Sequence, residues 1–186
     1  YGKSGCPDKS IKPTTIWYAD FLSEFLDKIG VEKAVVAGNS MGGAIAAWIA
    51  IRHPEKVEKL VLEDSAGLKG GLMDLFKSIA ELTPSWMFVP LIQTIFPVNE
   101  KTLAKVPKSE QMRIAVAEER YNSELRCCSS KAMKWSALSI GKDLVEDELG
   151  KIQIPTLIIW GSNDDLLNVK MAEQFHQKIP DSQVQI

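Results

Sequence analysis

The fold is decided by residues 34–43, which read AVVAGNSMGG. The first five form a short apolar run, which is typical of a central parallel strand that is buried on both faces. Residues 42–52 read as a helix with small residues near its start, and Pro54 ends it. Between them lies a turn at Asn39 and Ser40. A strand, a tight turn around a serine and a helix follow one another directly, as a Gly-x-Ser-x-Gly nucleophile elbow requires.

The glycines around Ser40 have a physical reason in such an elbow. The turn is tight enough to strain the backbone of the serine. We expect side chains two residues before and after it to collide unless they are small, which accounts for Gly38 and Gly42. The hydroxyl then projects above the carboxyl edge of the sheet, near the positive end of the helix, and the Met41 amide is predicted to form half of an oxyanion hole. A nucleotide-binding turn is the alternative, but no Gly-x-Gly-x-x-Gly pattern is present here.

Strand and helix patterns alternate along the rest of the chain, except in one long helical segment. Strands are expected at 34–38, 57–62, 156–160 and from Val184, with core helices at 16–29, 42–52 and 169–179. The stripe of helix 16–29 is expected at positions 18, 21, 22, 25, 26 and 29. The helical segment carries patterns at 72–82, 86–96, 109–121 and 124–140. The sequence therefore predicts an α/β fold: a parallel sheet with helices on both faces, built from residues 1–65 and 151–186, and a helical insertion at 66–150.

The composition of the chain argues against several classes of function. A formal net charge of −2 gives no basic field for nucleic acid, and no apolar run is long enough to span a bilayer. Three cysteines, two of them adjacent, favour a reducing, cytoplasmic location over a disulfide framework. The two histidines lack metal-ligand spacing, which argues against a zinc site, and we expect no cofactor. The oligomeric state does not follow from the sequence.

Three stretches together resemble the α/β-hydrolase superfamily. Residues 37–44 resemble the elbow of serine esterases and of hydrolases that cleave meta-cleavage products of aromatic compounds. Residues 53–62 are similar to the helix end and strand that follow that elbow, and residues 1–4 to a loop after an earlier strand. This resemblance implies that the insertion at 66–150 is a cap or lid. A serine, not an aspartate, at the elbow separates the chain from epoxide hydrolases and haloalkane dehalogenases.

The resemblance also implies an acid. Residues 154–164 are similar to the strand and loop that carry the acid of the family, three residues after a glycine, which selects Asp164. Its role would be to orient a histidine and stabilise the imidazolium. Asp165 is a competitor, and Glu63 and Asp64 occupy a position where some relatives place their acid. The alternative is that the carboxylate merely caps a turn.

The same family places its histidine in a loop after the last strand, which here would lie beyond Ile186. His53 and His176 fall outside that position, so we expect both to be structural. Because the chain lacks an initiator Met and the strands that would supply the second oxyanion donor, we expect it to be incomplete at both ends.

These observations favour a serine hydrolase of a small apolar carboxylic ester, which acts through an acyl-enzyme on Ser40. A hydrolase that breaks carbon–carbon bonds of meta-cleavage products is the close alternative. A non-catalytic binding protein with this fold, or a truncated pseudoenzyme, is the alternative from another class. Amphipathic lid helices often form an apolar substrate pocket, although the same residues can simply pack the lid; here they are Trp86, Met87, Phe88, Leu91, Ile92, Ile95, Phe96, Met133 and Trp135.

Overall fold

The computed structural model describes residues 8, 10–70, 72–95, 127–164 and 166–186. The chain divides into two compact units. One consists of residues 13–78 and 136–186 and contains the sheet. The other consists of residues 1–12 and 79–135. Each unit is described by itself, and the expected division into 1–65, 66–150 and 151–186 stays a prediction.

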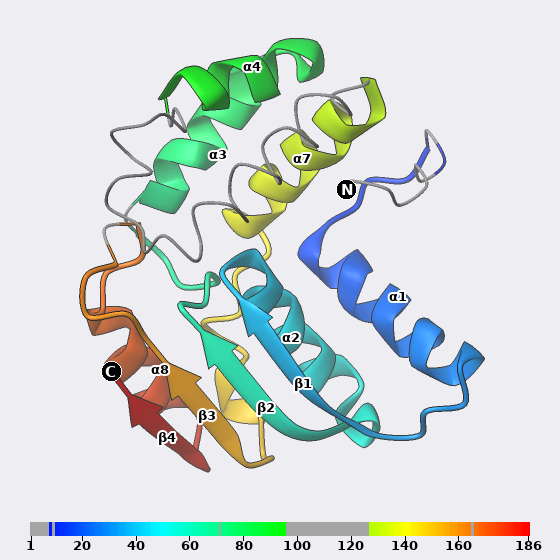
Figure 1. Cartoon of the computed structure of the whole chain (residues 1–186), viewed down its shortest axis with the longest axis vertical. Coiled ribbons are helices and arrows are strands. Elements are labelled where there is room, and N and C mark those ends of the chain that lie inside the picture. Colours follow the sequence, from blue (N-terminus) through cyan, green and yellow to red (C-terminus); the bar gives the residue numbers. More distant parts are fainter. Residues whose placement is uncertain (1–7, 9, 71, 96–126, 165) are drawn as a thin grey trace, which may run out of the picture. The chain divides into compact units, whose positions relative to one another are not determined.

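The sheet has four strands in the order β1-β2-β3-β4, and every neighbouring pair is parallel (Figure 1). The strands are β1 (Ala34–Asn39), β2 (Val57–Glu63), β3 (Thr156–Ile159) and β4 (Ser182–Gln185). Gly38 is paired with Leu62, Leu62 with Ile158, and Ile158 with Val184. The predicted parallel sheet is confirmed, with the last strand beginning two residues before the expected Val184.

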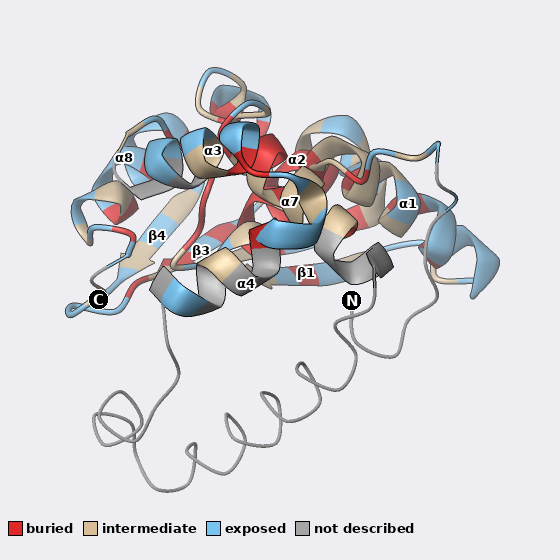
Figure 2. Ribbon diagram, turned by 90° about the horizontal axis from the view of Figure 1, so that it is seen from above, coloured by how far each residue is buried: buried red, intermediate tan, exposed pale blue. Residues whose placement is uncertain are grey.

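Three helices of this unit lie on one side of the sheet (Figure 2). Helix α2 (Met41–Arg52) packs against β1 and β2, α8 (Lys170–Lys178) packs against β3 and β4, and α1 (Thr15–Lys28) packs against α2. The core between these layers includes Ile49, Leu60, Leu62, Ile158 and Phe175, all essentially inaccessible to solvent.

The other face of the sheet is exposed within the described residues. Val35 of β1 is 55% exposed and Leu157 of β3 is 37% exposed. Side chains alternate between the two faces of a strand, so Val36, on the helix side, is buried while Val35 is not. The expectation that the strand at 34–38 is buried on both faces is therefore wrong for the described part of the chain.

Helix α1 buries a different stripe from the one expected. Thr15, Ala19, Ser23 and Leu26 are its buried residues, whereas the larger Phe21, Phe25 and Ile29 are about half exposed. The reason is its neighbour: α2 is rich in buried alanines, and two helices approach closely where the facing side chains are small. Thr14 caps the start of α1 as predicted, because its hydroxyl accepts a hydrogen bond from the Trp17 amide at 3.1 Å.

The secondary-structure elements in the described part of the insertion are all helices, joined by loops and turns. It contains α3 (Leu72–Leu82), α4 (Ser85–Ile95) and α7 (Cys127–Ile140), and no strand occurs in the described residues between 66 and 150. In the unit that contains 79–135, Phe88 is buried while Trp86 is 71% exposed. Lys134 Nζ donates to the Thr83 carbonyl at 2.5 Å. The predicted helix 109–121, Phe96 and the side chains of Ile92 and Ile95 lie outside the described residues.

Within the described ranges, every helix falls short, in length or hydropathy, of what a membrane crossing requires.

Candidate active site

Ser40 occupies the turn between β1 and α2 with φ 52° and ψ −118°. This backbone conformation is unfavourable for a residue with a side chain, and it matches the strain expected of an elbow. Hydrogen bonds fix the main chain of the serine on both sides. Its amide donates to the Glu63 carbonyl at 3.1 Å, and its carbonyl accepts from the amides of Gly43 and Ala66, each at 3.0 Å.

The close approaches that demand glycine differ in part from those expected. A Cβ atom on Gly38 would lie 2.1 Å from the carbonyl oxygen of Gly42, so the requirement at position 38 is confirmed. A Cβ atom on Gly42 would meet nothing within 4 Å, so the expected collision at position 42 is wrong. It is the backbone of residue 42 that crowds the strand. The second tight position is Gly43, where a Cβ atom would lie 2.4 Å from Ser65 Oγ.

Met41 is the first residue of α2. The first amides of a helix have no partner within the helix and carry its partial positive charge. The Ser40 carbonyl accepts hydrogen bonds from the amides of Gly43 and Ala44, at 3.0 and 3.3 Å, and these bonds form the first turn of the helix. This placement suits the predicted oxyanion donor, and the role itself stays a prediction.

Asp164 lies in the loop after β3, and its carboxylate is held by that loop. Oδ1 accepts from the amides of Leu166 and Leu167 at 2.7 and 2.9 Å. The indole Nε1 of buried Trp160 donates to the Leu167 carbonyl at 2.8 Å and so links the two ends of the loop. Turn capping is therefore real here. In the part of the chain that the structure describes, Oδ2 has no hydrogen-bond partner, which leaves one oxygen for another group. Asp165, the competitor, lies outside the described residues.

Asp64 follows β2 and makes a contact that sequence reasoning missed. Its Oδ1 accepts a hydrogen bond from the Gly161 amide at 2.8 Å, and its own backbone has φ 40°. The side chain of Glu63 is exposed, and its carbonyl also accepts from Asn39 Nδ2 at 3.3 Å. The sequence shows only that an acidic residue directly follows a strand. It does not show the hydrogen bond between residues 64 and 161, because that contact depends on which strands are neighbours in the sheet.

The three side chains come to one edge of the sheet. Ser40 follows β1, Asp64 follows β2 and Asp164 lies in the loop that follows β3, and these are consecutive parallel strands. Sites form at the carboxyl ends of parallel strands because the connecting loops meet there. The predicted juxtaposition of Ser40 and Asp164 at one sheet edge agrees with this topology.

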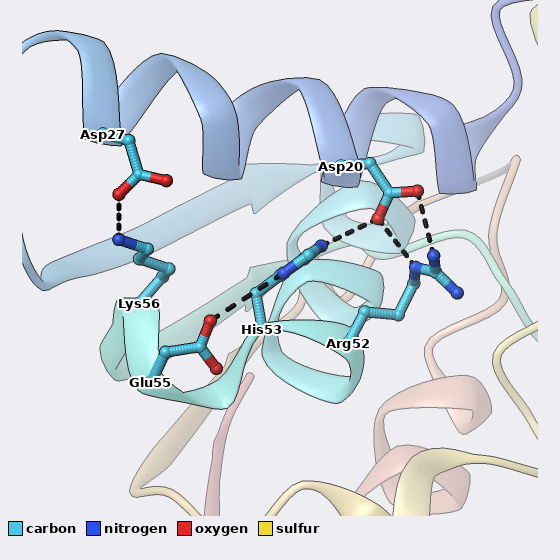
Figure 3. A network of polar contacts seen from close by, with 6 residues as sticks. All are labelled: Asp20, Asp27, Arg52, His53, Glu55 and Lys56. Atoms are coloured by element: carbon cyan, nitrogen blue, oxygen red, sulfur yellow. Dashed lines mark hydrogen bonds and ion pairs between the residues drawn. The ribbon is translucent and has the colours of Figure 1, made fainter.

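The two histidines of the chain lie at the opposite edge. His53 follows α2 and precedes β2, and its Nε2 lies 2.8 Å from Asp20 Oδ1 (Figure 3). His176 is in the last turn of α8, and its Nδ1 lies 2.8 Å from the hydroxyl of Ser182, the first residue of β4. Both sit near amino ends of strands, so neither is placed to take a proton from Ser40.

Asp20 also binds Arg52 with both oxygens, Nε to Oδ1 at 2.8 Å and Nη2 to Oδ2 at 3.0 Å (Figure 3). The hydrogen-bonded Arg52 guanidinium, with His53 beside it, lowers the pKa of Asp20 below its ordinary value of 3.8 and outweighs the effect of partial burial. The pKa of Arg52 is raised by the same pairing. This network joins α1 to the end of α2.

Among the described residues, no three His, Cys, Asp or Glu side chains gather in a way that could hold a metal ion.

The chain is similar to curated hydrolases over most of its length. It is 29% identical over 188 residues to Lipase 3 of Moraxella sp. (strain TA144), with 94% of this chain covered. It is 30% identical over 169 residues to 2-hydroxymuconate semialdehyde hydrolase of Pseudomonas putida, with 87% of this chain covered. The chain spans 57% and 56% of the length of these two relatives.

A solved esterase from Exiguobacterium antarcticum has the same fold, with a TM-score of 0.74 at 24% identity over 100% of this chain and 68% of that one. A family model described as serine aminopeptidase, S33, matches residues 1–186. With the parallel sheet, the turn at Ser40 and these matches together, the chain belongs to this family of α/β-hydrolases.

Proposed function

We propose that the whole protein is a serine hydrolase that cleaves a small, apolar carboxylic ester through an acyl-enzyme on Ser40. The observation that carries this proposal is the backbone of Ser40. A serine held at φ 52° between a parallel strand and a helix, at the carboxyl edge of the sheet, has its hydroxyl free of the helix that follows. Proteins keep such strain where it serves a function.

In the proposed reaction, Ser40 Oγ attacks the ester carbonyl while a base takes the hydroxyl proton. The Met41 amide stabilises the negative charge that develops on the carbonyl oxygen, because it is preorganised at the start of α2. The base returns the proton to the leaving alcohol, and water then hydrolyses the acyl-enzyme by the same steps. Asp164 orients the base through Oδ2, because Oδ1 is already bonded to the amides of Leu166 and Leu167.

The base is proposed to be a histidine other than His53 and His176. Those two are bonded to Asp20 and Ser182 at the amino ends of the strands, away from Ser40. A general base acts within about 2.6–3.2 Å of the proton that it removes. We therefore place the base in a part of the whole protein outside these 186 residues.

Hydrolysis of p-nitrophenyl acetate and butyrate by the whole protein tests the proposal. Ser40→Ala should lower kcat by about 10⁴-fold or more, because no other group replaces the nucleophile. The matched control is Ser78→Ala, which removes an exposed hydroxyl that donates to the Asp74 carbonyl of its own helix. The sample must be purified free of other esterases. If the Ser40→Ala variant in such a sample still turns over the ester, the serine mechanism is refuted.

A carbon–carbon bond hydrolase is the second candidate, and it is favoured by the 30% identity to the Pseudomonas putida semialdehyde hydrolase. The same nucleophile and oxyanion donor would then act on a vinylogous diketone. Loss of the yellow colour of a meta-cleavage product, measured beside ester turnover on the same sample, separates the two.

If neither substrate class is turned over and Ser40 is not labelled by a fluorophosphonate, a non-catalytic binding protein is the better description. The cytoplasmic location remains a proposal from the cysteine content.

A further inference from the structure

We propose that Asp64 is a positioning residue, which holds the loop that carries Asp164 in the place where that carboxylate acts. The proposal rests on the proposed function and assigns a second carboxylate to the same edge of the sheet. Asp64 would act through Gly161 and would not itself contact the base or the substrate.

Gly161 links the two aspartates. Its amide donates to Asp64 Oδ1 at 2.8 Å, and its carbonyl accepts from the Asp164 amide at 3.2 Å. One residue at the start of the loop is therefore held from β2 on one side and holds Asp164 on the other. Because Asp164 Oδ1 is already occupied by the amides of Leu166 and Leu167, the orientation of the carboxylate follows the orientation of the loop.

Asp64 is itself fixed. Its amide donates to the Ile159 carbonyl at 3.0 Å, which continues the pairing of β2 with β3 beyond the last paired residues. The preceding residue, Glu63, accepts the hydrogen bond of the Ser40 amide at 3.1 Å. The Glu63 carbonyl thus contacts the turn that carries Ser40, and the carboxylate of the next residue, Asp64, contacts the loop that carries Asp164. If one loop moved relative to the other, at least one of these two hydrogen bonds would have to break.

The backbone of Asp64 supports the same reading. Its φ of 40° is in a region that few residues other than glycine adopt, although aspartate and asparagine tolerate it better than most. Strained residues persist where the surroundings hold them for a purpose. Here the conformation brings the carboxylate onto the Gly161 amide. That amide needs an acceptor oxygen, which an asparagine side chain also supplies, so the positioning role depends on the oxygen and not on the charge.

Substitutions in the whole protein separate this role from that of a catalytic acid. Asp64→Asn keeps the acceptor oxygen and tolerates the backbone conformation, whereas Asp64→Gly removes the oxygen and relieves the backbone. The matched control is Glu58→Gln, which neutralises an exposed carboxylate on β2, the strand that Asp64 follows. In ester turnover we expect Asp64→Asn to stay within about threefold of wild type and Asp64→Gly to lose about 10- to 100-fold in kcat with little change in KM, because misplaced catalytic groups slow the chemical step. Glu58→Gln should be unchanged.

A double-mutant cycle shows whether Asp64 acts through Asp164. Once Asp164→Asn has removed the acid, the further change Asp64→Gly should lower kcat by less than about twofold, because both substitutions disable the same group. Amide hydrogen exchange supplies a readout without activity. Asp64→Gly should speed exchange at Gly161 and across residues 161–168, while Asp64→Asn and the strand pairs of β1 with β2 should stay protected.

Each failure has a distinct pattern. If Asp64→Asn loses as much activity as Asp64→Gly, the charge acts directly and the positioning role is overturned. Full additivity with Asp164→Asn, or unchanged exchange at Gly161 in Asp64→Gly, overturns it as well. Unimpaired turnover in Ser40→Ala and Asp164→Asn sinks the proposed function instead. Should Asp64→Gly not fold, the activity and the Gly161 protection of Asp64→Asn decide between the two roles.

Discussion

A Cβ atom on Gly38 would lie 2.1 Å from the carbonyl oxygen of Gly42, whereas a Cβ atom on Gly42 would meet nothing within 4 Å. These two glycines flank Ser40 symmetrically in sequence but not in space. Gly38 faces the helix backbone, whereas a Cβ atom on Gly42 would meet no described residue within 4 Å. Substitution by alanine should therefore destabilise the protein at position 38 and should not do so at position 42.

We expect Gly38→Ala to lower the free energy of unfolding by about 3 kcal/mol or more, because the backbone of the first helical turn would have to shift. Gly42→Ala should be neutral or stabilising by about 0.5–1 kcal/mol, since alanine is favoured over glycine within a helix. Urea unfolding followed by circular dichroism measures both. Equal destabilisation by the two variants would mean that the turn around Ser40 is not built as described.

Trp160→Phe tests the support of the acid loop. Trp160 is 1% exposed, its ring centroid lies 6.0 Å from that of Phe175, and its Nε1 donates to the Leu167 carbonyl. Phenylalanine keeps most of the buried ring but leaves that carbonyl without its donor, which should cost about 1–3 kcal/mol of unfolding free energy. We also expect faster amide exchange in residues 161–168. A variant as stable and as protected as wild type would show that this hydrogen bond does not hold the loop.

Asp20→Asn tests the network in Figure 3 through its pH dependence. Arg52 holds the pKa of Asp20 below 3.8, so the folded carboxylate binds a proton less readily than the unfolded one. Its contribution is fully present above pH 3.8 and is lost as the pH falls through the lower folded pKa. At pH 6 we expect the variant to be less stable than wild type by under about 1 kcal/mol, since the pair is partly exposed.

The difference between Asp20→Asn and wild type should shrink as the pH is lowered below 3.8. Denaturant midpoints at several pH values follow it, with Asp181→Asn as a control on another carboxylate. If the stability difference between Asp20→Asn and wild type instead grows as the pH falls, the pairing with Arg52 does not lower the pKa of Asp20 as described.

The 186-residue chain alone, without the rest of the protein, should react slowly or not at all with a fluorophosphonate at Ser40. Both of its histidines are bonded at the amino edge of the sheet, so neither is placed to act as a base on the Ser40 hydroxyl. Gel fluorescence of the labelled chain, with the whole protein as the positive control, measures the rate. Fast, stoichiometric labelling of the isolated chain would show that His53 or His176 serves as the base after all.

The sequence predicted the order of elements well because each signal is local. The strands at 34–38 and 57–62 and the turn at Ser40 depend on neighbouring residues, and the structure has them within a residue or two. The buried stripe of α1 could not be read in the same way. Phe21 and Phe25 look like core residues by hydropathy, but the helix that α1 meets is rich in alanine, and the small residues of α1 face it.

The candidate site shows the same division. Ser40, Met41 and Asp164 follow from motifs that are contiguous in sequence. The contact of Asp64 with Gly161 joins residues 97 positions apart and requires that β2 and β3 be neighbours in the sheet. The role of Gly43 was missed for a similar reason, because the side chain that it avoids belongs to Ser65, after the next strand. Pairwise contacts between loops are set by topology, which a single sequence does not display.

The strained backbone of Ser40 has a consequence for directed evolution. Among the described residues other than glycine, only Ser40 and Asp64 have positive φ, and each such conformation opposes folding by about 1–3 kcal/mol. A library screened for melting temperature alone would therefore enrich glycine at position 40 and discard the nucleophile. Persistence of serine there under mutational drift is a sign of selection for chemistry. Any campaign to make this protein more heat-resistant should thus couple its screen to labelling of Ser40.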